Sequence, residues 1–207
     1  MKHSSTRSLF DYWNEKRRDR PAPERADIEP AAIRHALGDT FMLAADFVDQ
    51  LRFRLAGTRV CALFCRELKG EEFTALWDED SRARIDDVLA AVNDEADGAV
   101  AGVTGRAADG QIDLEFMVLP LAHIGHARVR AIGTLTPLVP FYWLGEKPIV
   151  TLTLGTVRHI GSGLETVASP KSAPSTEPVA AIEDVRVRHG FVVYSGGRET
   201  PPGKRTG

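Results

Sequence analysis

Two cysteines and two histidines are the side chains of this sequence best suited to binding a metal. Cys61 and Cys65 lie four residues apart, so a helix would place both on one face, and His123 and His126 flank Gly125 in a turn-like segment. Closed zinc sites use these two residue types. The second close pair of cysteines that such sites commonly contain is missing, so we expect solvent-exposed histidines and no metal.

Two carboxylates, Asp113 and Glu115, have the spacing of a general acid and base. They alternate with Ile112, Leu114 and Phe116, so in a strand they project from the face opposite to the apolar residues. We therefore expect both to face solvent. The sequence also has no nucleophile elbow, phosphate-binding loop or HExxH helix, and we predict that the protein is not an enzyme.

Composition and charge favour an ordinary soluble protein. The 207 residues are 43% hydrophobic and carry a formal net charge of -3, which disfavours a dedicated nucleic-acid binder. Nucleic-acid contact through the basic tail, Arg186 to Arg205, is a second alternative function, which the short length of the tail and its interruption by Glu199 disfavour. No apolar run reaches the length of a signal peptide or a membrane span. A reduced, cytoplasmic protein with no membrane partner is the expectation.

Apolar periodicity predicts the main elements. Ser8 is expected to cap a first helix whose apolar stripe is Leu9, Phe10 and Trp13, and a second short helix should run from Asp27 to Gly38. A long helix is expected over Glu79–Asp97, with a solvated acidic face and Gly98 as its stop. The expected strands are Thr40–Val48, a strand from Leu51 through Leu55, Ala99–Arg106, Ile112–Leu119, Arg128–Leu135 and, as one further strand, Ile149–Leu154.

The segment Leu51 to Trp77 is predicted to form a strand followed by a helical lid. Leu51, Phe53 and Leu55 alternate with arginines, which indicates one buried strand face. Gly57 is expected to turn the chain with a positive φ.

A first lid helix is expected to begin after the N-cap Thr58 and to end at Gly70. It carries Cys65, for which a buried, inert environment is expected. A second short lid helix would bury Phe73, Leu76 and Trp77.

Together these elements predict an α+β fold: a five-stranded antiparallel sheet with helices on one face, an N-terminal helix, a C-terminal extension and a flexible tail. Asp109-Gly110 is expected to form a hairpin turn, and the aromatic run Phe141 to Trp143 should pack on the domain. The Ser/Pro-rich segment Gly161 to Pro178 should be disordered, and Phe191 to Tyr194 is an apolar island in the tail. The expected divisions are 1–38 (N-terminal helices), 39–138 (domain), 139–160 (extension) and 161–207 (linker and tail).

The order of short motifs from Leu9 to Pro137 resembles the PAS domain, in particular small, mostly alphaproteobacterial proteins with a PAS domain and no fused output domain. The residues that carry the resemblance are Tyr12-Trp13, Asp27-Ile28-Glu29-Pro30, Phe53-Arg54-Leu55-Ala56-Gly57-Thr58, Arg66-Glu67-Leu68-Lys69-Gly70, Leu76-Trp77, Leu119-Pro120-Leu121, Ile132-Gly133 and Gly196-Gly197-Arg198. The resemblance implies a five-stranded sheet and a sensory or protein-interaction role in bacterial signalling. It implies no particular ligand.

Flavin and haem are two cofactors that PAS domains bind, and each needs particular side chains in the protein. Cys65 stands where flavin-binding members carry a reactive cysteine, but Ala127 to Leu135 has neither the asparagine nor the glutamine that holds the flavin edge. The long helix Glu79–Asp97 has no histidine to ligate haem. We therefore predict a protein without either cofactor.

The predicted function is a non-catalytic sensory or interaction module whose output passes through a partner protein. A small enzyme or ligand-binding protein on a similar curved sheet is the alternative, and it would need an inward polar group. The expected pocket lining is apolar: Phe53, Leu55, Phe64, Trp77, Leu114 and Phe116. The expected partner-binding residues are Leu9, Phe10, Trp13, Met117 and Leu119. Because the strand Ile112–Pro120 becomes apolar on both faces, the N-terminal helix should cover its second face, from the same chain or by exchange in a homodimer.

Overall fold

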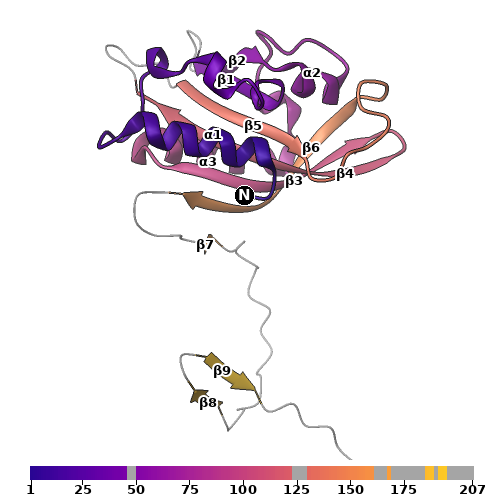
Figure 1. Cartoon of the computed structure of the whole chain (residues 1–207). Coiled ribbons are helices and arrows are strands. Elements are labelled where there is room, and N and C mark those ends of the chain that lie inside the picture. The colour runs from indigo at the N-terminus through magenta and orange to yellow at the C-terminus, as the bar shows by residue number, and fades with distance from the viewer. Residues whose placement is uncertain (46–49, 123–129, 161–166, 169–184, 189–190, 195–207) are drawn as a thin grey trace, which may run out of the picture. The chain divides into compact units, whose positions relative to one another are not determined.

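An antiparallel sheet of seven strands, in the order β2-β1-β5-β4-β3-β6-β7, is the central element (Figure 1). The structure is a computed structural model and describes residues 1–45, 50–122, 130–160, 167–168, 185–188 and 191–194. The strands are β1 (Thr40–Ala45), β2 (Leu51–Ala56), β3 (Gly98–Ala107), β4 (Gly110–Leu121), β5 (Arg130–Pro137), β6 (Ile149–Ile160) and β7 (Val167–Ala168). The predicted α+β class is confirmed. The further strand expected over Ile149–Leu154 is present as β6 and continues to Ile160, whereas β7 was not predicted.

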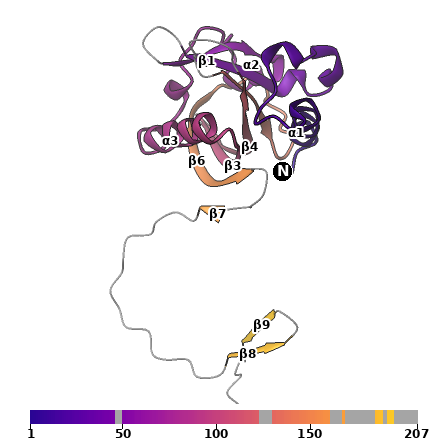
Figure 2. The ribbon, with the colours of Figure 1, turned by 90° about the vertical axis from the view of Figure 1, so that its left-hand side faces the viewer.

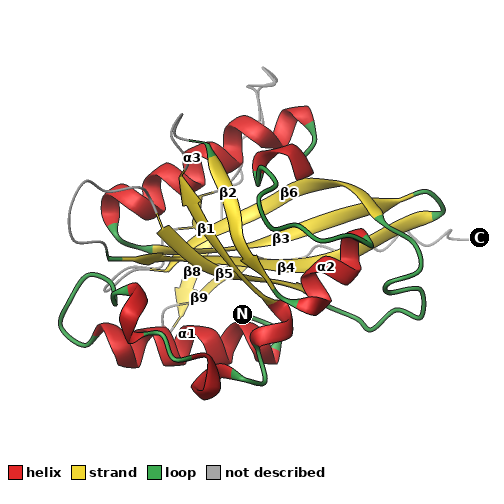
Figure 3. Ribbon diagram, turned by 90° about the horizontal axis from the view of Figure 1, so that it is seen from above, coloured by secondary structure: helices red, strands yellow, loops and turns green. Residues whose placement is uncertain are grey.

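Helices cover both faces of this sheet (Figures 2 and 3). The α-helices are α1 (Ser4–Arg17), α2 (Thr58–Phe64) and α3 (Glu79–Glu95), and the 3-10 helices are η1 (Arg25–Asp27), η2 (Pro30–Ile33), η3 (Leu37–Asp39) and η4 (Thr74–Leu76). Helices α2 and α3 pack on one face, and α1 packs on the other. The expected covering of the second face by the N-terminal helix is confirmed, and the same chain supplies it.

The sheet therefore separates two apolar cores. We call the first, between the sheet and α2 and α3, the lid-side core; it contains Phe41, Phe53, Phe73, Trp77 and Phe116. The second lies under α1 and is called the α1-side core; it contains Leu9, Trp13, Met117, Leu119 and Ile132. Strand β4 serves both cores because its side chains alternate between the faces.

The N-terminal helices differ from the prediction at their boundaries. Helix α1 begins at Ser4 rather than after Ser8, because His3 caps it by accepting a hydrogen bond from the Ser5 amide at 3.2 Å. The single helix expected from Asp27 to Gly38 is replaced by the three short 3-10 helices η1, η2 and η3. Ile33 is buried there, as expected.

Gly57 is essential to the turn into α2, but for a reason other than the predicted one. Its φ is -68°, and it is the N-cap, whereas Thr58 is the first helical residue. A Cβ at Gly57 would lie 2.1 Å from the Leu37 carbonyl oxygen and 2.4 Å from that of Gly38. The glycine is required by this close approach of two backbone segments and not by a positive φ.

The lid is also shorter than predicted. Helix α2 ends at Phe64, and Cys65 follows in the left-handed conformation with φ 52°. Gly70 adopts φ 87° in a separate turn. The expected second lid helix is only the 3-10 helix η4.

Helix α3 follows the lid at nearly its predicted length. Asp78 caps it by accepting a hydrogen bond from the Ser81 amide, and Ala96, with φ 55°, ends it where Gly98 was expected to. Its acidic side chains Asp86, Asp87, Asp94 and Glu95 are exposed, as predicted.

Two predictions for the part of the chain after β3 are confirmed, namely the hairpin turn at Asp109-Gly110 and the packing of the aromatic run on the domain. Ala107 pairs with Gly110 at the expected hairpin, and Phe141 and Trp143 pack against the lid-side core while Tyr142 is 90% exposed. By its contacts the chain divides into two units, Met1–Pro170 and Lys171–Gly207. The second contains an antiparallel pair, β8 (Val185–Arg188) and β9 (Phe191–Tyr194).

Several predictions fall beyond the described residues. His123, His126 and all of the predicted linker except the two residues of β7 lie outside them. Within the described part, no helix has both the length and the hydropathy that crossing a membrane requires.

Candidate ligand pocket and interaction surface

Five of the six side chains predicted to line a pocket lie together in the lid-side core. They are Phe53, Phe64, Trp77, Leu114 and Phe116. Here the rings of Phe41, Phe53, Phe73, Trp77 and Phe116 pack on one another, each within 5.5–5.9 Å of at least two others. These distances are those of direct ring contact. Side chains of the protein thus occupy the face where the pocket was expected.

One polar atom in this core has no protein partner. The indole Nε1 of Trp77 is buried and makes no hydrogen bond to any described residue. A buried donor of this kind usually finds an acceptor. The binding of a ligand by these side chains stays a prediction.

Leu55, the sixth predicted lining residue, lies on the other face of the sheet. Met42 pairs with Leu55, but Leu43 pairs with Phe53, so Arg54 is an extra residue in β2. This β-bulge breaks the alternation and turns Leu55 away from the core that holds Phe53. Leu55 is consequently 42% exposed, and the prediction that it shares the pocket with Phe53 is wrong.

An apolar groove lies where Leu55 emerges. It has a volume of about 320 Å³ and runs between the 3-10 segment η1–η3 and the strands β1, β2 and β5. Its main lining side chains are Ile28, Ile33, Leu37, Met42, Leu55 and Ile132. The sequence did not reveal this groove, because it depends on the bulge and on the path of three short 3-10 helices.

Buried polar groups fix α1 next to this groove. Glu115 is only 5% exposed, and its carboxylate accepts hydrogen bonds from the backbone amides of Lys2 at 2.5 Å and His3 at 2.9 Å. The prediction that Glu115 faces solvent is wrong, because the start of α1 covers it; Asp113 is exposed, as predicted. Burial alone would raise the pKa of Glu115, but the two amides stabilise the carboxylate and hold the pKa below its ordinary value.

A second anchor joins α1 to the turn before β1. The buried carboxylate of Asp39 accepts a hydrogen bond from the Ser5 hydroxyl at 2.6 Å and pairs with both Nε and Nη2 of Arg59 at 2.7 Å. Thr6 meets Thr134 of β5 at 3.2 Å. The ion pair raises the pKa of Arg59. These contacts set the position of α1, α2 and β1 relative to one another.

Comparison with known families decides which fold family this is. Residues 1–136, more than half of the chain, match the family model described as PAS domain. The chain belongs to the PAS domain family. No protein among the curated ones matches it. PAS domains are in general sensory modules of signalling proteins, and the match begins at residue 1, so α1 is part of the matched region.

Most of the predicted partner-binding residues of this PAS domain are buried in its core. Leu9, Trp13, Met117 and Leu119 are almost fully buried, and they hold α1 on the sheet. Phe10 is half-buried and stacks on Trp13, with ring centroids 6.3 Å apart. A partner can therefore reach Phe10 on the folded domain, but it could reach the other four only if α1 left the sheet.

The two cysteines do not form a metal site among the described residues. Cys61 is half-buried, and Cys65 is exposed, so the expectation that Cys65 is buried is wrong. Burial raises the pKa of the Cys61 thiol, and the nearby carboxylate of Glu67 adds to the effect. Across the part of the chain that is described, no three histidine, cysteine, aspartate or glutamate side chains are grouped so that they could hold a metal ion.

Proposed function

We propose that this PAS domain is a non-catalytic sensory module of the cytoplasm whose output is contact with a partner protein. The observation that supports it is the filled lid-side core, in which five aromatic rings pack on one another on the face where a pocket was expected. A domain whose inner face is filled by its own side chains acts through its surface.

Helix α1 is the proposed contact element. It carries the half-buried Phe10 beside the buried Trp13, and it is joined to β4, β5 and the turn before β1 by Glu115, Thr134 and Asp39. A change in any of these elements would reach α1 through direct hydrogen bonds. Phe10 is also partly exposed, and aromatic residues are enriched at protein interfaces relative to the rest of the protein surface.

Affinity capture of the intact protein from the cells that express it tests this function. The bait proteins are the wild type, Phe10→Ser and the matched control Asp11→Ser, whose side chain is exposed one position along the same helix. We expect the wild type and Asp11→Ser to capture the same partner in near-equal amounts, and Phe10→Ser to lose most of it. Circular dichroism should show that all three baits are folded.

The same preparations test the absence of catalysis and cofactor. The purified protein should be colourless, and it should turn over no small-molecule substrate by itself. A flavin or haem absorbance band at near one equivalent would contradict the cofactor expectation. Equal capture by all three baits would show that Phe10 is not in the contact.

A further inference from the structure

The groove at Leu55 combines an apolar floor with positive charge at one end. A second hollow of about 250 Å³ adjoins it and shares Arg25, Met42 and Leu55 with it; Arg54 lines this hollow as well. Two arginines on separate elements, η1 and the β2 bulge, therefore border the same cavity. The bulge has a double effect, because it places Leu55 in the groove and adds Arg54 as the extra residue.

These two guanidinium groups have no carboxylate partner among the described residues. Arg25 makes one weak hydrogen bond, to the Ile28 carbonyl oxygen at 3.3 Å, and Arg54 makes no hydrogen bond or ion pair with the described chain. Arg25 lacks a carboxylate partner in the described part of the chain even though Glu24, Asp27 and Glu29 lie close to it in sequence.

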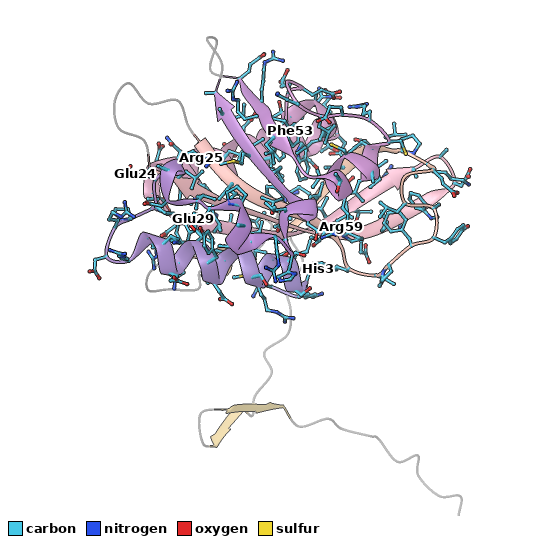
Figure 4. The ribbon with its side chains drawn as sticks, turned by 45° about the horizontal axis from the view of Figure 1, so that its top comes forward. His3, Glu24, Arg25, Glu29, Phe53 and Arg59 are labelled. Atoms are coloured by element: carbon cyan, nitrogen blue, oxygen red, sulfur yellow. The ribbon has the colours of Figure 1, made fainter. Side chains whose placement is uncertain are left out.

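Each of those acidic residues is already paired with a basic side chain of α1 or of the turn after it. Arg20 pairs with Glu24 at 3.8 Å and with Asp27 at 2.7 Å, and Lys16 pairs with Glu29 at 3.7 Å. Figure 4 shows Glu24, Arg25 and Glu29 on the segment that crosses between α1 and the strands β1 and β2. The acidic side chains near Arg25 in sequence are thus neutralised by Lys16 and Arg20, and the positive charge of Arg25 at the groove is not.

We propose that this groove binds a small amphipathic carboxylate, with its aliphatic chain against Ile28, Met42 and Leu55 and its carboxylate between Arg25 and Arg54. Charge complementarity indicates an anionic head group, and a planar guanidinium binds a carboxylate through two parallel hydrogen bonds. The apolar lining of the groove, whose volume is about 320 Å³, indicates an aliphatic tail.

The site lies outside the lid-side core. The carboxylate would meet the α1 face of the sheet, next to the segment that leads from α1 into β1. This inference goes beyond the proposed function, since it names a ligand and not a partner, and either one can fail without the other.

Calorimetric titration of the full-length protein with octanoate tests the proposal, with 1-octanol and octyltrimethylammonium as probes of equal chain length. We expect saturable binding of octanoate, weaker binding of the neutral alcohol and the weakest binding of the cation. The octanoate affinity should fall as salt is raised, because exposed arginines are screened. Amide chemical shifts should change in η1 and β2 and not in α3.

Three variants separate the site from general surface charge. Arg25→Gln and Arg54→Gln should each weaken octanoate binding about tenfold, as loss of one charged hydrogen bond implies. Arg34→Gln is the matched control, because Arg34 is exposed at the end of η2 and lines neither hollow. It should bind octanoate as the wild type does.

Other results would overturn the proposal. Equal affinity for octanoate and 1-octanol, or equal weakening by all three variants, would mean that no carboxylate site exists. No octanoate binding at millimolar concentration would do the same. Amide shifts at the groove that follow protein concentration instead of octanoate would identify it as a contact between two copies of the chain.

Discussion

The two faces of the central sheet achieve burial by different means. On the lid side, aromatic and aliphatic side chains fill the space with few polar atoms, and α2, η4 and α3 lie directly on them. On the α1 side, the apolar contacts of Leu9 and Trp13 are supplemented by the buried carboxylates Glu115 and Asp39. An apolar groove is left open beside them.

The two sides of the sheet should therefore respond differently to mutation and to pH. Ring packing on the lid side depends on shape alone, so any loss of volume there should cost stability directly. Attachment of α1 depends partly on hydrogen bonds to buried carboxylates. Burial alone would raise the pKa of Glu115, but the backbone amides of His3 and Lys2 lower it. We therefore expect stability on the α1 side, unlike that on the lid side, to depend on pH through Glu115.

Phe116→Ala should have the largest effect, because it removes the ring that contacts Phe41, Phe73 and Trp77. We expect the free energy of unfolding to fall by about 3–5 kcal/mol, as for other buried phenylalanines. Urea denaturation measures this. Tyr142→Ala, at a 90% exposed aromatic, is the control and should change little. A small loss at Phe116 would mean that the lid-side core is loosely packed.

Gly57→Val should rank next, because its side chain would collide with the Leu37 carbonyl. Two backbone segments would have to separate, and we expect a loss of about 1–3 kcal/mol in unfolding free energy. Gly102→Ala is the control, since a Cβ there meets nothing within 4 Å. Thermal melting of both variants distinguishes them, and matched melting temperatures would show that the approach at Gly57 is not tight.

Glu115→Gln should produce a pH-dependent effect on the α1 side. The folded pKa of Glu115 lies below its unfolded value of about 4.3, so the carboxylate contributes stability above that pH. This contribution is lost as the pH falls through the folded pKa. We expect the variant to be less stable than the wild type by about 1–2 kcal/mol at neutral pH.

The difference between wild type and Glu115→Gln should shrink below about pH 4. Urea denaturation at neutral and acidic pH provides the comparison. A constant difference at every pH would mean that the Glu115 carboxylate does not stabilise the start of α1 through its charge.

The sequence predicted those features that depend on local periodicity. The α+β class, the packing of α1 on Met117 and Leu119, and the shared face of Phe53, Trp77 and Phe116 all follow from alternation or helical spacing. That these three side chains would fill the space where a pocket was expected was not predicted. Long-range contacts were missed. Nothing local to Glu115 shows that Lys2 and His3 will donate to it, and nothing local to Gly57 shows that Leu37 will approach it.

The bulge in β2 is the clearest case of such a failure. Leu51, Phe53 and Leu55 alternate perfectly with arginines, yet one extra residue in the pairing with β1 reverses the side on which Leu55 lies. Pairing register is a property of two strands, so the pattern of one strand cannot reveal it. The positions of Leu55 and Arg54 at the groove depend on this single irregularity.

Leu55→Ala should therefore have the smallest effect of the four substitutions. Leu55 is 42% exposed, so truncating it removes contacts on only one side and leaves no enclosed cavity. We expect the unfolding free energy to fall by less than about 1 kcal/mol, against about 2–5 kcal/mol for a fully buried leucine. Leu114→Ala, on the lid side, supplies that buried reference. Urea denaturation measures the free energy of unfolding of both variants. An equal decrease for Leu55→Ala and Leu114→Ala would indicate that Leu55 is buried in the lid-side core, and it would contradict the bulge in β2.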